Sequence, residues 1–138
     1  MSLADQLCAA VIVVFAAPLY NFGVLQHVKT WIDLVVAGAP MSARLREGTP
    51  VVVVVTRGGA YGPGTPREGR DHVIGSVERI VSSVWGAGLG IVDRGFTLVG
   101  VNPALDEFCY LARDMKMAAE EAASVAGMSL ADRTLADR

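Results

Sequence analysis

The chain has 138 residues, of which 52% are hydrophobic and 19% are charged. These values predict one folded domain with a substantial core and exclude an intrinsically disordered chain. Twelve basic and fourteen acidic residues give a net charge of −2, and the sequence has no basic stripe. This balance argues against nucleic acid or an anionic membrane as the main partner.

Three features of the sequence bear on where the protein works. No apolar run reaches the roughly 18–20 residues that a membrane-spanning helix needs. The N-terminus lacks the basic region that precedes the apolar run of a secretory signal. Cys8 and Cys109 have neither CxxC nor metal-site spacing, so we expect two buried thiols in a reducing compartment. Together these features predict a cytoplasmic protein without a metal site.

The first predicted elements are a short helix, a buried strand and a loop. Residues 2–10 are compatible with a helix, and the run from Val11 to Phe15 is apolar and β-branched without polar alternation. Such a run is typical of a strand buried on both faces, as in a parallel sheet covered by helices. Because proline cannot donate to a strand ladder, we expect the strand to stop at Pro18. The loop that follows lies where ligands bind in open α/β sheets.

The same order of elements then repeats. One apolar face over residues 24–36 predicts a helix that ends at Gly38. A second apolar strand is predicted over residues 51–55, and it opens into the glycine-rich loop 56–64. Two consecutive buried strands that each open into an unusual loop favour a ligand site at their ends.

A third helix is predicted after the glycine-rich loop. Residues 65–68 have the form of a capping box, with threonine at the cap, proline next and glutamate three residues on. The clearer amphipathic pattern covers residues 73–85, and Gly86, Gly88 and Gly90 are expected to end it.

The C-terminal third is predicted to contain one more strand and a long helix. We expect the strand over residues 96–101, and Asn102 followed by proline is typical of a helix start. The periodic apolar pattern of the helix ends at Gly127, before a short tandem repeat. This predicts a domain over residues 1–127 and an exposed tail over residues 128–138.

Three segments of the sequence resemble one protein family. They are Ala-Pro-Leu-Tyr-Asn-Phe at 17–22, Lys-Thr-Trp-Ile-Asp at 29–33 and Thr-Arg-Gly-Gly at 56–59. Together they resemble the FMN-dependent NADH-azoreductases, which belong to the flavodoxin-like NAD(P)H:quinone oxidoreductases. The predicted β-α-β-α-β-α order agrees with the fold that this resemblance implies, a flavodoxin-like α/β three-layer sandwich with a parallel sheet.

The resemblance also implies a cofactor and the residues that hold it. FMN would take a hydride from NADH and reduce a quinone or an azo compound, so no catalytic side chain is needed. A homodimer with the site at its interface is implied as well. One edge and face of the flavin ring would contact Pro18, Leu19, Tyr20, Asn21 and Phe22, and its pyrimidine side would contact Thr56, Arg57, Gly58, Gly59 and Tyr61.

The sequence departs from the family pattern ahead of Val11. Related enzymes begin with a strand, a Ser-rich loop that binds the FMN phosphate, a helix and a second strand, and this sequence shows none of them before Val11. We therefore expect a fold that lacks the first two strands and the phosphate-binding loop, with an open apolar edge beside residues 11–15. Either the chain is N-terminally truncated and binds FMN weakly, or a partner supplies the missing elements. The alternative to an enzyme is a non-catalytic flavodoxin-like module with weak or no FMN binding.

Other residues that could carry chemistry have simpler interpretations. His27 and His72 fall on polar helical faces, where a solvated histidine is the commoner case. Trp31 and Trp85 fall on apolar stripes, so we expect them in the core or in a dimer contact.

Overall fold

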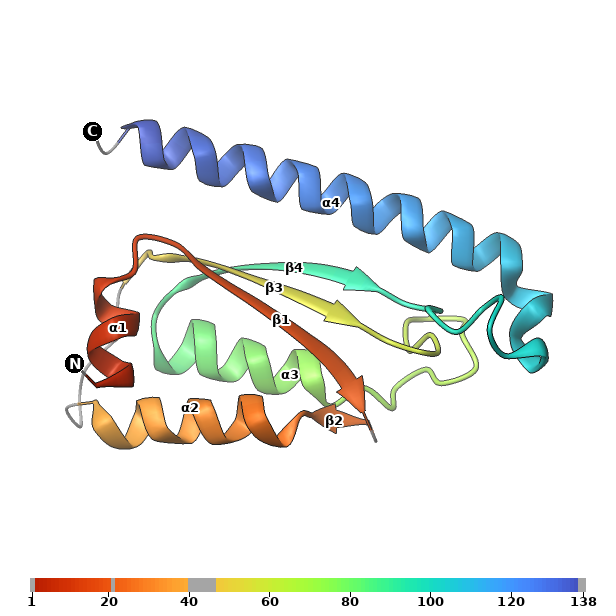
Figure 1. The fold of residues 1–138 in the computed structure, drawn as a ribbon, viewed down its shortest axis with the longest axis horizontal. Coiled ribbons are helices and arrows are strands. Elements are labelled where there is room, and N and C mark those ends of the chain that lie inside the picture. The colour runs from red at the N-terminus through yellow and green to blue at the C-terminus, as the bar shows by residue number, and fades with distance from the viewer. Residues whose placement is uncertain (1, 21, 40–46, 137–138) are drawn as a thin grey trace.

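The structure, a computed structural model, describes residues 2–20, 22–39 and 47–136 (Figure 1). Three long strands alternate with helices, as the sequence predicts. In chain order the elements are α1 (Leu3–Ala9), β1 (Val13–Tyr20), β2 (Gly23–Val24), α2 (Gln26–Gly38), β3 (Pro50–Thr56), α3 (Val73–Glu78) with its π-helical continuation η1 (Arg79–Val84), β4 (Gly88–Arg94), the 3₁₀ helix η2 (Pro103–Phe108) and α4 (Cys109–Ala136).

The strands form one mostly parallel sheet in the order β2-β1-β3-β4. β1 pairs with β3 in parallel from Val13 opposite Val51 to Pro18 opposite Thr56. β3 pairs with β4 in parallel, and the two-residue β2 pairs with the end of β1 antiparallel. Because the three long strands run in one direction, their carboxyl ends lie at the same edge of the sheet (Figure 1). The predicted α/β architecture is confirmed.

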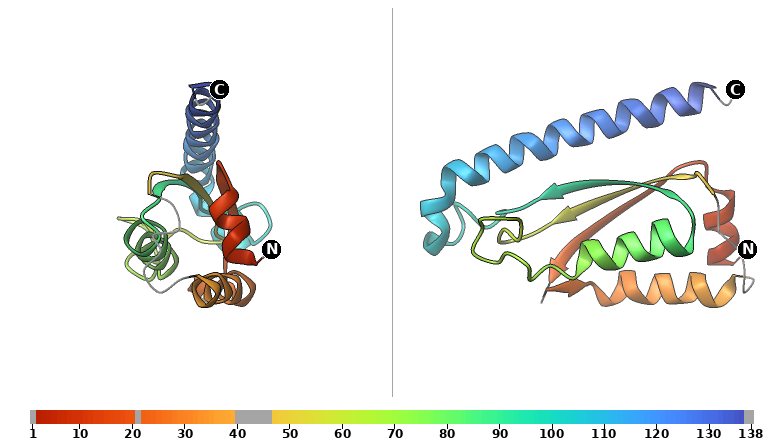
Figure 2. Two further views of the ribbon diagram at one scale, coloured as in Figure 1. Left: turned by 90° about the vertical axis from the view of Figure 1, so that its left-hand side faces the viewer. Right: turned by 180° about the vertical axis from the view of Figure 1, so that it is seen from behind.

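Helices cover both faces of the sheet, which gives three layers. α1, α2 and α3 lie on one side, and α4 lies alone on the other (Figure 2). Side chains along β3 point alternately to the two faces of the sheet, so both faces need a cover. Val51, Val53 and Val55 pack in the core under α2 and α3. Val52 and Val54 point the other way, toward the alanines and leucine of α4. β3 is therefore buried on both faces, as predicted.

β1 differs from its prediction in two ways. The strand does not stop at Pro18 but continues to Tyr20. Along Val13–Pro18 its only partner among the described residues is β3, so β1 is an edge strand there, which is where a sheet tolerates proline. Val14 is 61% exposed, so β1 is covered on one face only. The expected open apolar edge is present.

The third strand lies elsewhere than predicted. β4 covers Gly88–Arg94, whereas residues 96–101 form turns. Gly88 and Gly90, which the sequence assigns to the end of the preceding helix, lie in this strand because it pairs with β3 along its whole length.

The predicted capping box at residues 65–68 starts no helix. These residues form turns, in which the Gly64 N–H donates to Glu68 Oε2 at 2.9 Å. α3 begins at Val73, whose N–H donates to Asp71 Oδ1 at 2.8 Å. Asp71 thus takes the capping role that the sequence pattern assigns to Thr65.

The last helix begins as predicted and ends later. Asn102 Oδ1 accepts a hydrogen bond from the Ala104 N–H at 3.1 Å, which caps η2. α4 then runs without interruption through Gly127 to Ala136, so the predicted end at Gly127 is wrong. A glycine inside a helix costs about 1 kcal/mol, which the surrounding alanines and leucines offset. Residues 137 and 138 of the predicted tail lie outside the described residues.

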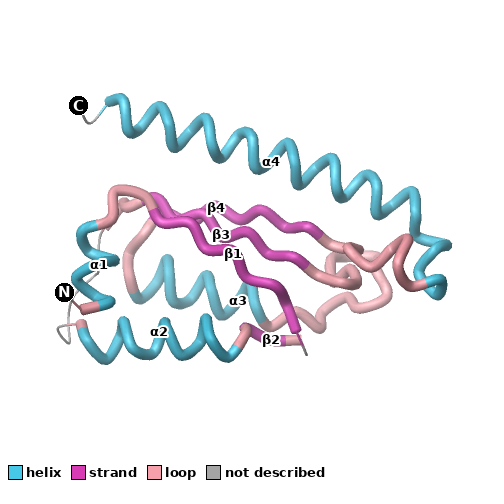
Figure 3. The backbone as a smooth tube through the Cα atoms, viewed as in Figure 1, coloured by secondary structure: helices cyan, strands magenta, loops and turns pink. Residues whose placement is uncertain are grey.

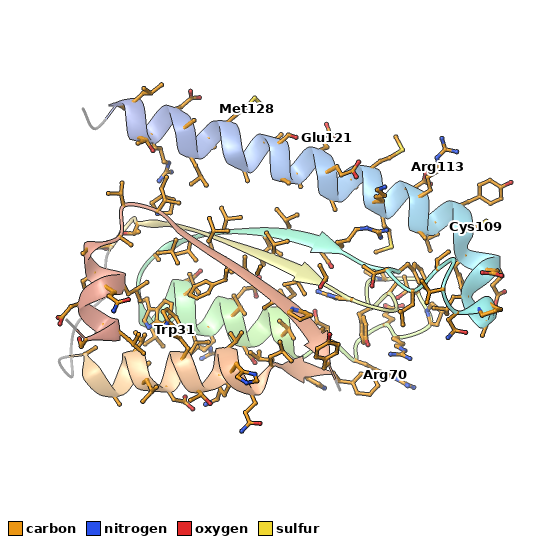
Figure 4. All side chains as sticks on the ribbon, viewed as in Figure 1. Trp31, Arg70, Cys109, Arg113, Glu121 and Met128 are labelled. Atoms are coloured by element: carbon orange, nitrogen blue, oxygen red, sulfur yellow. The ribbon has the colours of Figure 1, made fainter. Side chains whose placement is uncertain are left out.

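Aromatic side chains fill the core between the sheet and α2. The ring of Phe15 lies 4.9 Å from that of Trp31, which in turn lies 6.0 Å from Trp85. Trp31 lies between α2 and the sheet (Figure 4), and both tryptophans are core residues, as predicted. Cys8 and Cys109 are exposed, so the expectation of buried thiols is wrong. No described helix is long and apolar enough to cross a membrane.

The two faces of the sheet predict different tolerance to the same substitution. Val55 is fully buried in β3, so Val55→Ala should lower the free energy of unfolding by about 2–3 kcal/mol through lost burial and a cavity. Val14→Ala removes the same atoms from the exposed face of β1 and should cost under about 0.5 kcal/mol. Urea denaturation of both variants checks this, and equal losses would contradict the uncovered face of β1.

Candidate functional site

A cleft of ≈ 550 Å³ opens at the carboxyl ends of the parallel strands. Figure 3 shows the loops that gather at this end of the sheet. The volume falls within the range of about 300–1,000 Å³ that is typical of small-molecule sites. The cleft is lined by Pro18, Leu19, Tyr20, Phe22, Thr56, Arg57, Gly58, Gly59, Ala60, Tyr61, Pro66, Arg67, Phe96, Thr97, Leu98, Asn102 and Leu105.

The structure brings the predicted site residues together. Nine of the ten residues that the sequence assigns to the site line this one cleft. The tenth, Asn21, lies outside the described residues. These residues meet because the sheet register sets Pro18 opposite Thr56. The loops after β1 and β3 therefore begin side by side at the edge of the sheet.

The glycine-rich loop after β3 is held from one side by residues 96–98. The carbonyls of Arg57, Gly58 and Gly59 accept hydrogen bonds from the N–H groups of Thr97, Leu98 and Phe96, at 3.0, 3.4 and 2.9 Å. In a trans peptide the N–H that follows a carbonyl points the opposite way. The N–H groups of residues 58–60 therefore face away from residues 96–98, and they donate to no other described residue.

The glycine at position 58 allows a close approach between the loop and the side chain of Leu98. A Cβ placed there would lie 2.7 Å from Leu98 Cδ1 and 3.1 Å from Leu98 Cγ, closer than van der Waals contact. Gly62 lies on the same loop, and a Cβ there would meet nothing within 4 Å. Gly58 lets the loop pack on Leu98 while both line the cleft.

Arg57 lines the cleft, but its charge has a structural role. Its side chain is only 3% exposed, and Nη2 lies 3.0 Å from Asp71 Oδ2 while Nε lies 3.2 Å from Asp93 Oδ1. Among the described residues neither nitrogen has an aligned hydrogen-bond acceptor, so the contacts are ionic rather than directional. Because a buried charge needs a counter-charge, Arg57 ties the ends of β3 and β4 to the start of α3.

The two carboxylates around Arg57 differ in their environment. Asp71 is 17% exposed, and its other oxygen caps α3, whereas the Asp93 side chain is 41% exposed. Partial burial raises the pKa of Asp93 above its ordinary value, and the nearby Asp71 raises it further, against the opposite effect of Arg57. Asp71 is therefore the principal partner of Arg57.

An arginine and two aromatic rings form one wall of the cleft. The rings of Phe22 and Tyr61 meet edge to face at 6.1 Å. The Arg67 guanidinium lies 5.6 and 5.7 Å from their centroids, and its Nη1 donates to Tyr61 Oη at 2.8 Å. Phe22 has a φ of 64°, a left-handed conformation that turns the chain out of β1 at this wall.

The sequence interpretation missed the other half of the lining. The sequence pattern predicts Arg67 in a capping box and residues 96–98 in a strand, so it assigns neither to the site. The signal that could have found residues 96–98 is the apolar segment 88–92, which ends earlier and frees them to form a loop. His27 and His72 are exposed and line no part of this cleft.

Comparison with known proteins places the chain in a family. Residues 1–87 match the family described as flavodoxin-like fold. The chain belongs to the flavodoxin-like family.

Among similar proteins of this family, an FMN-dependent NADH:quinone oxidoreductase of Streptomyces avermitilis is 35% identical over 124 residues, covering 88% of this chain and 57% of the relative. A protein of the same name from Streptomyces coelicolor is 34% identical over 142 residues, covering 99% and 63%. The crystal structure of an azoreductase from Bacillus anthracis shares the fold, with a TM-score of 0.66 at 24% identity, over 90% of this chain and 59% of that one. This flavodoxin-like chain thus spans about three fifths of the length of the relatives it matches.

The ion pairs of Arg57 predict unequal effects for two substitutions. Asp71→Asn keeps an oxygen to cap α3 but removes the main counter-charge, so the free energy of unfolding should fall by about 2 kcal/mol. Asp93→Asn, at the more exposed carboxylate, should change it by less than about 1 kcal/mol, because burial of the Asp93 charge opposes its attraction to Arg57. Urea denaturation at pH 7 compares them, and a greater loss from Asp93→Asn would contradict this ranking.

The raised pKa of Asp93 predicts a pH dependence of stability. Between the ordinary carboxyl pKa and the raised one, the folded chain keeps a proton that the unfolded chain has lost. The contribution of Asp93 to the free energy of unfolding should therefore fall as pH rises through that window. Denaturation from pH 3 to pH 7 should show Asp93→Asn gaining stability relative to the wild type. NMR titration of the carboxyl carbon should give a pKa above 3.8, and a lower value would contradict the effect of burial.

Proposed function

We propose that this flavodoxin-like chain binds the isoalloxazine ring of FMN in the cleft and acts as an FMN-dependent NAD(P)H oxidoreductase, with NADH as electron donor and a quinone or an azo compound as acceptor. The observation that carries the proposal is the convergence of the loops after β1 and β3 on one cleft. The names of the Streptomyces relatives agree with this cofactor and donor.

The groups that line the cleft suit a flat ring with a polar edge. Tyr20 and Phe22 are 63% and 39% exposed, and they offer aromatic surface beside Pro18. The N–H groups of residues 58–60 offer donors to ring oxygens and nitrogens. FMN would supply the hydride chemistry, and the backbone N–H groups of residues 58–60 would stabilise the negative charge that the ring gains.

The reaction needs no nucleophile or general base from this chain. Arg57 is held by its carboxylates, so we assign it to the support of the loop rather than to direct ring contact. The residues of this chain bind the ring, orient it and shield it from water. We assign the ring to this cleft and assign no described residue to the FMN phosphate.

We further propose that the protein works in the cytoplasm as a homodimer with a second copy over the cleft. Exposed apolar side chains line the cleft, among them Tyr20, Phe22 and Leu98. A second copy would bury them and close the site to water. Light scattering at micromolar concentration should give twice the chain mass, and a monomer under these conditions would contradict the dimer.

Flavin titration and steady-state kinetics test the proposed function. The purified chain should quench FMN fluorescence on binding, and it should oxidise NADH only when FMN and a quinone are both present. Quinone reduction without binding, at the rate of FMN free in solution, would contradict the proposal. A colourless chain that binds no FMN at millimolar concentration would favour the non-catalytic module.

Gly58 predicts a specific loss of flavin binding. Gly58→Ala should push Leu98 into the cleft and weaken FMN binding about tenfold or more, with a smaller effect on stability because Leu98 is exposed and can move. Gly62→Ala meets no atoms and lies outside the cleft lining, so it should leave FMN affinity unchanged. FMN titration of both variants checks this. Equal affinities would show that the ring does not lie against residue 58.

A further inference from the structure

Two arginines line the cleft, and they differ in whether a carboxylate balances their charge. Arg57 is buried between Asp71 and Asp93. Arg67 is exposed, and no carboxylate of the described chain forms an ion pair with it. Apart from these two arginines, the described lining residues carry no formal charge. Arg67 is therefore the source of uncompensated positive charge in the cleft.

Although exposed, Arg67 is held in place by its neighbours. The guanidinium lies over the rings of Phe22 and Tyr61 and donates one hydrogen bond to the Tyr61 hydroxyl. The loop that carries it is fixed by the Thr65 hydroxyl, which donates to the Gly62 carbonyl at 2.6 Å. A guanidinium has five N–H donors, so most of them remain for a ligand.

The cation lies beside the unused backbone donors. A Cβ on Gly59 would lie 3.5 Å from Arg67 Cδ and 3.6 Å from its Nε. Gly59 is also the middle residue of the three whose N–H groups donate to no described residue. A charged group and neutral donors thus meet at one end of the cleft, an arrangement that favours negative charge on whatever occupies it.

We propose that Arg67, with the N–H groups of residues 58–60, binds the edge of the flavin ring that becomes negatively charged on reduction, and so raises the reduction potential of the bound FMN. This inference rests on the proposed function. NADH delivers two electrons and one proton as a hydride and leaves as NAD⁺, so the ring gains one negative charge. A cation at that edge stabilises the reduced ring more than the oxidised one.

The charge on FMN has a second source, its phosphate, and the experiment separates the two. Riboflavin carries the same ring without phosphate. If Arg67 acts on the ring, its removal affects both flavins, and the effect is larger in the reduced state. If Arg67 acts on the phosphate, its removal weakens FMN binding equally in both redox states and leaves riboflavin binding unchanged.

The test compares Arg67→Met with Arg70→Met in the full chain. Both changes remove one positive charge from the same loop, but Arg70, labelled in Figure 4, is not among the residues that line the cleft. Arg67→Lys is the conservative variant, since it keeps the charge without the planar fork. For each protein, flavin titration gives the affinity of the oxidised form, and equilibration with a redox dye gives the potential of the bound flavin.

We expect Arg67→Met to weaken the binding of reduced flavin at least tenfold more than the binding of oxidised flavin. For a two-electron couple, that difference lowers the potential by about 30 mV. The shift should appear with FMN and with riboflavin, Arg67→Lys should recover part of it, and Arg70→Met should match the wild type. A purely structural role of Arg67 would weaken both redox forms alike and leave the potential unchanged.

The remaining outcomes overturn the inference in distinguishable ways. Equal potentials for Arg67→Met and Arg70→Met, with flavin still bound, refute the role of Arg67 and leave the proposed function intact. A loss confined to FMN assigns Arg67 to the phosphate and refutes the contact with the ring. A wild-type chain that binds neither flavin refutes the proposed function together with this inference.

Discussion

The parallel pairing of β1 with β3 is the constraint on which the site depends. The register that sets Val13 opposite Val51 also sets Pro18 opposite Thr56. A parallel ladder cannot slip by one residue without turning every side chain to the other face. Such a slip would take Val51, Val53 and Val55 out of the core, so the hydrophobic interior fixes the register. The level at which both loops leave the sheet, and hence the cleft, follows from the same burial.

The ion pairs of Arg57 then hold the loop after β3 in the position that the sheet register gives it. A buried guanidinium without a counter-charge would be destabilising by several kcal/mol, so the position of Arg57 is tied to Asp71 and Asp93. Asp71 lies at the start of α3 and Asp93 near the end of β4, so one side chain joins three elements. The carbonyls of the loop bond to residues 96–98 on the outer side, which leaves its N–H groups for a ligand.

The sequence predicts the parts of this fold that repeat one simple pattern. The valine run of β3, the amphipathic face of α2 and the two loops at strand ends are all predicted from residue type and spacing. The errors come from residues whose role is set by distant neighbours. Pro18 can lie inside a strand because β1 is an edge strand at that point. The glycines of β4 adopt the extended conformation because the strand pairs with β3.

The same reason limits what could be predicted of the site. A Thr-Pro-Arg-Glu segment looks like a helix start when read alone, and only packing against Phe22 and Tyr61 makes Arg67 a wall of the cleft. Likewise the family resemblance predicts that Arg57 contacts the ring. Its burial beside Asp71 and Asp93 depends on residues 14 and 36 positions further along the chain, which no local pattern reveals.

The two halves of the cleft are not equally supported. The half after β3 belongs to a strand that is paired on both sides, and it is held by Arg57 and by residues 96–98. The half after β1 belongs to a strand that pairs with β3 on one side only along Val13–Pro18, with Val14 uncovered, and whose last two residues pair with the short β2. A strand with an open edge loses local structure more easily than one paired on both sides. In the proposed complex the better-supported half would therefore hold the polar edge of the ring, and the aromatic contacts of Tyr20 and Phe22 would be the ones that respond to whatever covers β1.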